Sequence, residues 1–268
     1  VDIGRVVNTG QASGSLDLTT GTLTTETLRI GTVQGSNGQF TITNGAAAAD
    51  GRLSVTDGAV VIAEPLPQFL GTATIGGIAT PDPTVAATAR GQLDLTRSSL
   101  TGGFLTAGTF GGEGTVTAQD ASTIDVNRLA VGVNGGVGAL TLDASSLAVR
   151  AHPTIANQGS MFVGTNDGSG AVAATNSTLS IDNVLRIAQG STGVATSLGR
   201  LALADSTLSV GGFVTIGSFG TQSRGELSLV DSTATVGNFL RLGEAANSGQ
   251  LFGEAMLEVR SSLLTIGG

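Results

Sequence analysis

One pattern repeats along almost the whole length of this sequence. It is clearest in two segments, "GRLALADSTLSVGGFVTIGS" from Gly199 and "GELSLVDSTATVGNFLRLGE" from Gly225. With the glycine as position 0, positions 2 and 4 are apolar, positions 6 and 7 are Asp and Ser, and two further apolar pairs precede a final glycine. An internal period of this length is the signature of a repeat architecture.

The same pattern starts at seven other glycines and at one alanine. These starts are Gly14, Gly38, Gly51, Gly91, Gly114, Gly138, Gly170 and Ala255. Positions 2 and 4 are apolar after every start, although only 40% of the chain is hydrophobic. Gly38 and Gly51 are too close together to open two full repeats, so we expect one of them to begin a half-coil.

Each repeat predicts three short strands. Apolar and polar residues alternate within each segment, which is the period of a strand with one buried face, and Gly, Asp-Ser or Asn turns separate the segments. We therefore expect an all-β parallel β-helix, or β-solenoid, with three short strands per coil, about nine to ten coils and almost no helix. Equivalent inward residues, such as Leu203 and Leu229, should stack in adjacent coils.

Residues 1–268 are expected to form a single β-solenoid domain. Loop insertions are predicted near residues 63–90 and 150–160, where prolines and polar residues interrupt the repeat. Both ends of the chain read as incomplete coils, since it opens with a third-strand motif and closes after "SSLLTIGG".

The run GxLxLxDSxLxVGxFLxIG resembles the glycine-rich β-solenoid repeats of bacterial autotransporter passengers and of surface proteins associated with PEP-CTERM systems. The resemblance covers nearly the whole chain, but the shared motif is structural. It implies an extracellular protein of the bacterial cell surface or biofilm matrix, with a structural or adhesive role. It transfers no catalytic residue to this chain.

Residues suited to catalysis are sparse. His152, the one histidine, precedes Pro153 in an expected loop, so we interpret it as an ordinary loop residue. Polysaccharide-cleaving β-helices need clustered acidic or basic groups, whereas the outward positions 1 and 3 carry what look like scattered single charges. We predict a non-enzymatic protein with no cofactor and no catalytic residue.

Position 6 forms a column of short polar residues, followed by serine at position 7. The column contains Asn44, Asp57, Asp120, Asn176, Asp205 and Asp231, and the serines are Ser98, Ser145, Ser177, Ser206, Ser232 and Ser262. Such side chains can bond nearby backbone groups at a corner, so we interpret both columns as caps. Stacked carboxylates also suit Ca²⁺, which is the alternative.

Charge and hydropathy exclude two classes of partner. A net charge of −8, with 12 basic residues scattered singly, argues against binding to nucleic acid. Apolar runs stay well short of the roughly 20 residues that span a bilayer, so we do not expect membrane insertion.

Small hydroxyl side chains follow the outward positions 8 and 10. The candidate ligand face consists of Thr22, Thr24, Thr101, Thr178, Thr207, Thr233 and Thr235. It would suit a cell-surface glycan or, less well, ice. The simpler interpretation is that threonine favours an exposed strand and gives a smooth face for lateral packing.

The two ends suggest self-association. Joining the tail to the head completes a repeat, and the residues that would meet are Val1, Ile3, Leu257, Val259, Leu264 and Ile266. We expect copies to stack head to tail into a homopolymeric filament by strand addition. The alternatives are a fragment of a longer repeat chain, such as an adhesin or autotransporter passenger, and a capped monomer.

Overall fold

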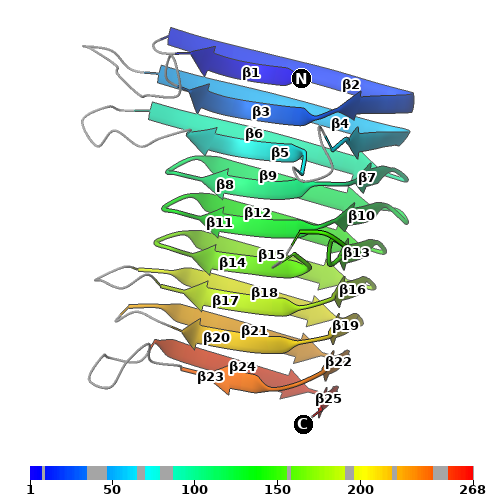
Figure 1. The fold of residues 1–268 in the computed structure, drawn as a ribbon, viewed down its shortest axis with the longest axis vertical. Coiled ribbons are helices and arrows are strands. Elements are labelled where there is room, and N and C mark those ends of the chain that lie inside the picture. The colour runs from blue at the N-terminus through cyan, green and yellow to red at the C-terminus, as the bar shows by residue number, and fades with distance from the viewer. Residues whose placement is uncertain are drawn as a thin grey trace.

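Strands stack along one axis of the molecule, with the N-terminus at one end and the C-terminus at the other (Figure 1). The computed structural model describes residues 1–7, 10–34, 47–64, 70–78, 87–155, 158–190, 196–218, 222–243 and 253–267. Within these residues there is no helix, and neighbouring strands pair in parallel. The chain is therefore an all-β parallel β-helix, as the repeat predicts.

Each coil contributes to three columns of strands. The first column contains β2 (Gly10–Thr25), β4 (Ala47–Ile62), β6 (Ala87–Thr96), β9 (Glu113–Gln119), β12 (Val137–Asp143), β15 (Ser169–Thr175), β18 (Leu198–Ala204), β21 (Arg224–Val230) and β24 (Glu254–Arg260). The second column contains β7 (Ser99–Thr101), β10 (Thr123–Val126), β13 (Ser146–Val149), β16 (Thr178–Ile181), β19 (Thr207–Val210), β22 (Thr233–Val236) and β25 (Leu263–Ile266). The third column contains β1 (Asp2–Val7), β3 (Thr27–Gln34), β5 (Thr72–Ile78), β8 (Phe104–Thr109), β11 (Arg128–Val133), β14 (Ser160–Thr165), β17 (Val184–Gln189), β20 (Phe213–Ser218) and β23 (Leu240–Leu242).

The first two columns merge at the N-terminal end of the rod. β4 pairs with β6 through its first half and with β7 through its second half. As a result, the first and second columns form one 16-stranded sheet, and the third column forms a separate nine-stranded sheet.

The register confirms most of the predicted repeat and corrects one start. Leu203 pairs with Leu229 in adjacent coils, as predicted. Gly14 pairs directly with Gly51, so Gly51 opens the second coil. Gly38 lies outside the described residues, and no first-column strand of the described chain stands between these two pairing partners. Nine coil starts therefore lie in register.

The predicted insertion at residues 63–90 does not behave as one loop. It contains β5, which pairs with β3 on one side and β8 on the other, so the third column is unbroken through this coil. The sequence signal was masked because prolines at positions 65, 67, 81 and 83 surround the short run that forms this strand.

The core is a narrow column of aliphatic side chains enclosed by the three strand columns. Inward residues such as Leu53, Leu93 and Leu140 are almost fully buried, and they belong to one continuous cluster that runs from Ile3 to Val236. Because each coil packs only on its neighbours, this core stabilises the rod through repeated contacts between adjacent coils.

The first and third columns meet along a glycine seam. Its third-column members are Gly4, Gly31, Gly76, Gly108, Gly132, Gly164, Ala188, Gly217 and Gly243, and all have positive φ. A Cβ added at Gly132 would lie 1.8 Å from the carbonyl oxygen of Ser169. A Cβ at the facing start Gly138 would lie 2.2 Å from the Gly132 nitrogen. The two columns therefore touch backbone to backbone, which explains why the sequence needs so many glycines.

Candidate binding surfaces

The position-6 column has a conformational role. Its members at Asp57, Asp120, Asp205 and Asp231 are exposed and have φ between 49° and 56°. Asp and Asn tolerate this left-handed region better than other side chains that carry a Cβ, so their enrichment follows from the turn. Asn44 lies outside the described residues.

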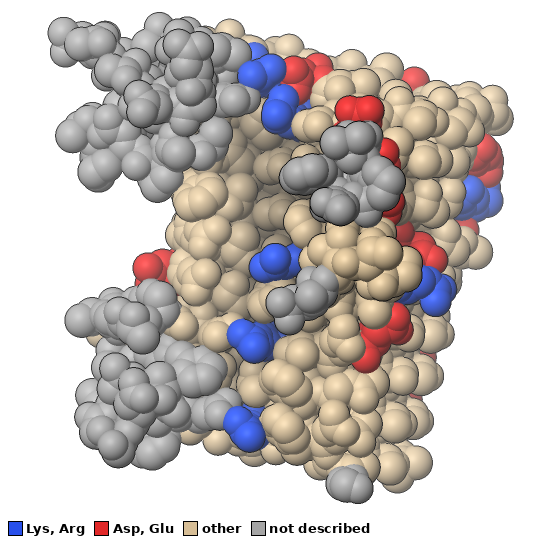
Figure 2. Space-filling model, viewed as in Figure 1, with Lys and Arg blue, Asp and Glu red and all other residues tan. Residues whose placement is uncertain are grey.

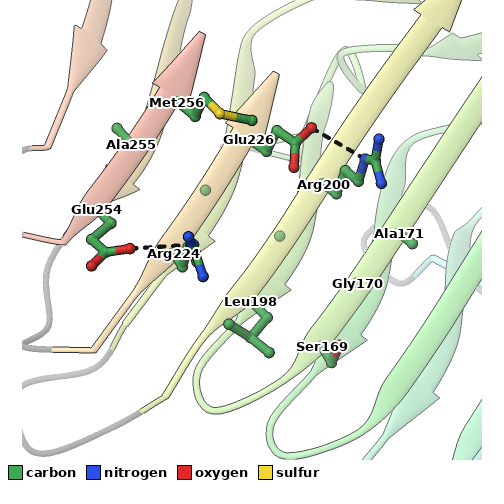
Figure 3. Close-up of a pocket in the computed structure, with 12 residues that line it drawn as sticks. Ser169, Gly170, Ala171, Leu198, Arg200, Arg224, Glu226, Glu254, Ala255 and Met256 are labelled. Atoms are coloured by element: carbon green, nitrogen blue, oxygen red, sulfur yellow. Dashed lines mark ion pairs between the residues drawn. The ribbon is translucent and has the colours of Figure 1, made fainter. Parts of the chain in front are cut away.

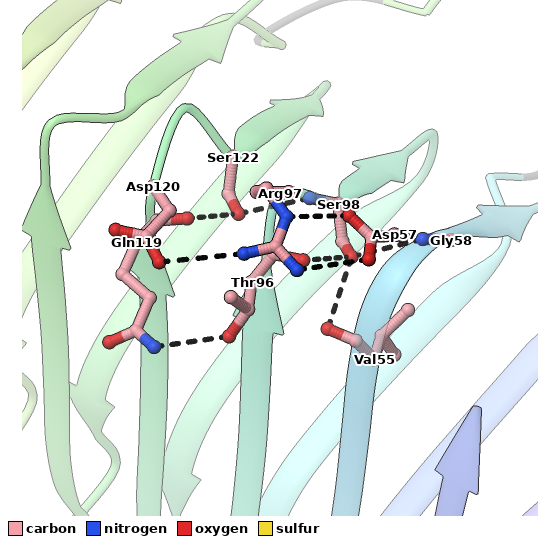
Figure 4. Close-up of polar contacts among 9 residues, drawn as sticks. All are labelled: Val55, Asp57, Gly58, Thr96, Arg97, Ser98, Gln119, Asp120 and Ser122. Atoms are coloured by element: carbon pink, nitrogen blue, oxygen red, sulfur yellow. Dashed lines mark hydrogen bonds and ion pairs between the residues drawn. The ribbon is translucent and has the colours of Figure 1, made fainter. Parts of the chain in front are cut away.

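Serine at position 7 provides the hydrogen bonds that the corner requires. The Ser206 hydroxyl donates to the carbonyl oxygen of Ala204, at 2.7 Å, and accepts from the Ser177 backbone nitrogen, at 3.0 Å. Ser98, Ser177 and Ser232 repeat both contacts with their own neighbours. Figure 4 shows the contacts of Ser98. These buried serines form a serine ladder that links successive coils, so the predicted cap is made by position 7.

Ser122 belongs to the serine ladder but was missed by the sequence pattern. Its hydroxyl accepts from the backbone nitrogen of Ser98, at 3.1 Å, and donates to the carbonyl oxygen of Gln119, at 2.6 Å. One extra residue, Ala121, has positive φ and shifts this serine to position 8. Aligning the following apolar pair, Ile124 and Val126, would have shown the shift.

Arg97 lies between two carboxylates of the position-6 column (Figure 4). Its guanidinium donates to both oxygens of Asp57, at 2.6 and 2.9 Å, and lies 4.0 Å from Asp120. The hydrogen bond from Arg97 holds the pKa of Asp57 below its usual value. No group of three or more metal-ligating side chains occurs among the described residues, and the dispensability of calcium stays a prediction.

His152 makes hydrogen bonds through both of its ring nitrogens, which its sequence context did not indicate. Its Nε2 lies 3.0 Å from the Glu64 carboxylate, and its side chain is only 9% exposed. The backbone nitrogens of Thr154 and Ile155 donate to Nδ1, at 3.3 and 3.2 Å. Since Nδ1 accepts, Nε2 is the nitrogen that donates to Glu64. The contact fastens two loops that are 88 residues apart in the chain.

Part of the predicted ligand face forms a continuous row on the second column of strands. Thr178, Thr207 and Thr233 are consecutive partners in the register, and all three are exposed. Thr22 and Thr24 pair with Ala59 and Val61, so the hydroxyl strip is interrupted after the first coil. Thr101 pairs with Asp125, a charged residue bound to Arg150. The row that contains Thr178 carries hydroxyl side chains without a break from Ser99 to Thr233 and ends at Leu263 in the last coil, while Thr235 continues the neighbouring row from Ser209.

The predicted self-association residues lie on the two end coils, but their exposure differs. Val1 is exposed, whereas Ile3 is 6% exposed and already belongs to the core cluster. Leu257 and Leu264 are half-buried against that core, while Val259 and Ile266 are exposed. Among the described residues, Leu263, which the pattern did not select, is the most exposed large apolar side chain at 60%.

Outward charges of the first column pair between adjacent coils, which corrects the expectation of scattered single charges. Arg52 donates to Asp94, at 3.0 Å, and Arg200 lies 3.4 Å from Glu226. Near the last coil, Arg200, Arg224, Glu226 and Glu254 line a shallow hollow of about 350 Å³ (Figure 3). Because each of its arginines already faces a glutamate, the hollow is an ion-pair network between coils.

A ladder of arginine and phenylalanine follows the outer face of the third column. It consists of Phe104, Arg128, Phe162, Arg186, Phe213, Phe239 and Arg241. The Arg128 guanidinium lies 4.7 Å from the centre of the Phe162 ring, and Phe213 stacks on Phe239 at 4.9 Å. Partial burial lowers the pKa of Arg128 from its usual value. Figure 2 shows basic side chains spaced along this face.

The sequence pattern did not reveal this arginine–phenylalanine ladder. Its members occupy two different outward positions of the third strand, and the distance from the coil start varies between coils. A signal was present, since four of the five phenylalanines in the described residues belong to it and Phe110 is the fifth.

Comparisons with known proteins identify no relative of this chain, so any functional proposal depends on the surfaces described above. A scan against models of protein families and searches of the curated proteins and the solved structures find no match to this chain. Within the described residues, no helix has the length and apolar character needed to cross a bilayer.

Proposed function

We propose that this chain is a non-enzymatic structural protein of the bacterial cell surface or matrix, whose rod extends by stacking of end coils. The observation that carries the proposal is the apolar surface of the last coil. Leu264 is half-buried and Ile266 is 48% exposed there, whereas the equivalent residues Ala234 and Val236 one coil earlier are 0% and 1% exposed. Such a surface is the type that strand addition buries.

The register of the rod predicts how a second copy would fit. Extending each row by one coil places Leu257 on Leu16 of the second copy and Leu264 on Leu23, as in the interior rows. The same extension places Arg241 opposite Asp2, and Asp2 already faces Arg29 in the same row, at 3.4 Å. Apolar rows and one opposite-charge pair therefore favour a head-to-tail contact between copies.

One contact opposes stacking and makes the proposal specific. Glu258 would lie opposite Asp17 of the second copy, although Arg260 and Ser228 already bind Glu258. Like charges placed opposite one another in paired strands are destabilising. We expect stacking to strengthen in the variant Glu258→Gln, which removes this repulsion.

Sedimentation velocity and negative-stain microscopy over a concentration series test the proposal. We expect filaments that grow with concentration, with the strand spacing of about 4.8 Å along their length. Ile266→Asp should shift assembly to higher concentration, and Ser209→Asp, at an exposed position outside both end coils, is the matched control. A monomer at every concentration, or assembly that Ile266→Asp leaves unchanged, would contradict stacking.

A second candidate function is adhesion through the hydroxyl strip. The unbroken column from Thr178 through Thr207 to Thr233 offers aligned hydroxyl groups on an exposed strand face, which suits neutral sugar hydroxyls. A glycan array run with Thr207→Val and Thr233→Val would show loss of neutral-glycan signal if this face binds, while filament growth would be unaffected. Ice-affinity purification tests the less favoured ligand on the same face.

A further inference from the structure

One row of outward side chains on the first column is complementary to its own reverse. The row consists of the residue that precedes each coil start, and its members from β6 to β24 are register partners in adjacent coils. This charge row contains, in chain order, Arg90, Glu113, Val137, Ser169, Leu198, Arg224 and Glu254. From either end towards Ser169 it passes an ion pair and then one large apolar residue, but the two ion pairs have opposite order. Figure 3 shows the second half of the charge row as successive side chains from Ser169 to Glu254.

The side chains of the charge row stand at the surface. Its two ion pairs join atoms 3.0 Å apart at one end and 3.2 Å apart at the other, yet their four side chains are between 57% and 76% exposed. Val137 and Leu198 are 52% and 42% exposed. The row therefore presents charged and apolar groups that a second molecule can contact.

A second copy of this chain matches the charge row in one orientation. When two sheets face each other across a two-fold axis parallel to their strands, the rods run antiparallel and each row meets the same row in reverse order. With the axis through Ser169, the facing residues of the two copies are Arg90 with Glu254, Glu113 with Arg224, and Val137 with Leu198. Each charge of the row then meets an opposite charge, and each large apolar side chain meets another.

The shape of the face also suits this arrangement. The hollow of about 350 Å³ on the first column is lined by Leu198 together with small residues such as Gly170 and Ala171 (Figure 3). Val137 of the second copy would lie opposite Leu198, so it would enter this hollow. Ala139 and Ala202, the neighbouring outward residues on β12 and β18, are also small and allow the two sheets to approach.

The area of the face is sufficient for a stable pair. The charge row crosses seven coils, and the strands from β9 to β24 in the first column are seven residues long. At about 4.8 Å between strands and about 3.3 Å per residue, the face measures about 34 Å by 23 Å. This is close to the area of about 800 Å² that each partner contributes to a specific interface.

One like-charge contact on the strand face opposes the arrangement. Asp94 would lie opposite Glu258 of the second copy, because both stand at position 3 of coils equally far from β15. Arg52 donates to Asp94, at 3.0 Å, and Arg260 pairs with Glu258, so each carboxylate already has a cation beside it. The dimer would contain two such contacts, against four opposite-charge contacts within the charge row.

We propose that two copies of this chain pair laterally through the first column, with antiparallel rods and a two-fold axis at Ser169. A contact of this kind closes on itself and leaves the end coils uncovered. It is therefore separate from head-to-tail stacking, and either can occur without the other. Where both occur, the lateral contact joins two filaments of opposite direction.

Exchanging the charges of one ion pair at a time tests the proposal. One variant is Arg90→Glu/Glu113→Arg and the other is Arg224→Glu/Glu254→Arg, and both carry Ile266→Asp, as does the parent, to disfavour stacking. Each exchange keeps the net charge and the ion pair within the chain, but it turns four attractions across the axis into repulsions. In sedimentation velocity, each variant alone should dimerise at least about tenfold more weakly than the parent. An equimolar mixture of the two should dimerise as readily as the parent, because the exchanged ends again meet opposite charges.

The mixture distinguishes this interface from other contacts. Recovery of the dimer on mixing requires the two ends of the charge row to face each other, which neither net charge nor stacking of end coils produces. Asp125→Arg/Arg150→Asp, an exchange beside the second column, is the matched control and should leave dimerisation unchanged. A parent chain that stays monomeric at every concentration, exchange variants that dimerise like the parent, or a mixture that stays monomeric would each overturn the proposal.

The residue on the axis gives a second, position-specific test. The chain contains no cysteine, so Ser169→Cys introduces one thiol in each copy, and the two thiols would face each other. A bismaleimide that spans the sheet spacing of about 10 Å should link them into a dimer, whereas copies stacked end to end would hold them about 43 Å apart. Ser209→Cys, exposed on the second column, should not be linked. Equal linking of both cysteine variants, or of neither, would contradict the position of the axis.

Discussion

Two columns of left-handed backbone run along this rod, and they tolerate different residues. The position-6 column holds Thr, Asp, Arg, Ala, Asn and Ser at φ between 46° and 60°. The glycine seam has similar φ values but holds glycine at every place except Ala188. Position-6 side chains point to solvent, whereas a Cβ in the seam would meet the backbone of the facing column. Glycine is therefore required in the seam mainly because two backbones approach closely there, and positive φ alone does not require it.

The sharpest way to break this comparison is to add one methyl group to the seam. Gly132→Ala should lower the free energy of unfolding by about 3 kcal/mol or more, because left-handed strain and a backbone clash add together. Gly135→Ala is the matched control, since Gly135 also has positive φ but its added Cβ would lie 4.0 Å from the nearest atom. Denaturant melts that place both variants at the same stability would refute the backbone-contact explanation.

Loss of one rung of the serine ladder should have the next largest effect. Ser206→Ala removes the hydroxyl that accepts from the Ser177 backbone nitrogen, and it leaves that buried donor unpaired. We expect a loss of about 1–3 kcal/mol in the free energy of unfolding. Ser209→Ala, an exposed serine of the same coil, should change stability by less than about 0.5 kcal/mol. Hydrogen exchange at Ser177 would speed up only in the first variant.

Ala188, the one residue of the glycine seam that is not glycine, predicts a substitution that increases stability. Ala188 is fully buried with φ of 55°, at the place where Gly164 and Gly217 stand in the adjacent coils. Ala188→Gly should stabilise the protein by up to about 1 kcal/mol, because relief of left-handed strain exceeds the greater flexibility of glycine in the unfolded chain. A lower melting temperature in this variant would show that Ala188 is packed without strain.

At position 6, the remaining contribution is electrostatic and depends on pH. The pKa of Asp57 is lowered in the folded protein by its hydrogen bond from Arg97, so this contact stabilises the fold above the ordinary Asp pKa of 3.8. The stabilisation is lost as pH falls through the lower, folded-state pKa. Melting temperatures measured from pH 5 downwards should fall less steeply in Arg97→Gln than in the parent chain. If the melting temperatures of the two proteins fell in parallel with pH, the Asp57–Arg97 contact would not be the source of this stabilisation.

Calcium should have the smallest effect of all. If the position-6 carboxylates serve the turn conformation, adding a chelator should leave the melting temperature unchanged within error. A sharp drop in chelator, restored by Ca²⁺ and not by Mg²⁺, would reassign Asp205 and Asp231 to a metal site.

The sequence was sufficient to predict features that depend on the alternation of apolar and polar residues within a coil. It was not sufficient to predict contacts between outward side chains at different positions of neighbouring coils. Leu203 and Leu229 could be aligned because every coil repeats positions 2 and 4 in the same place. Arg128 and Phe162 could not, because they occupy different outward positions and meet only when coils stack with a fixed register. The pattern did not select Ser122 for a simpler reason, because one inserted residue, Ala121, moves this serine from position 7 to position 8.

The hydrogen bonds between coils have a mechanical consequence. They run along the rod axis, so a force that pulls the two ends apart loads them one coil at a time, as in peeling. Release of the coil from Gly114 to Gly138 alone would free 24 residues and lengthen the chain by about 80 Å. A rod of this kind would yield in small steps under tension and re-form coil by coil on its remaining neighbours, which gives a tether that extends before it breaks.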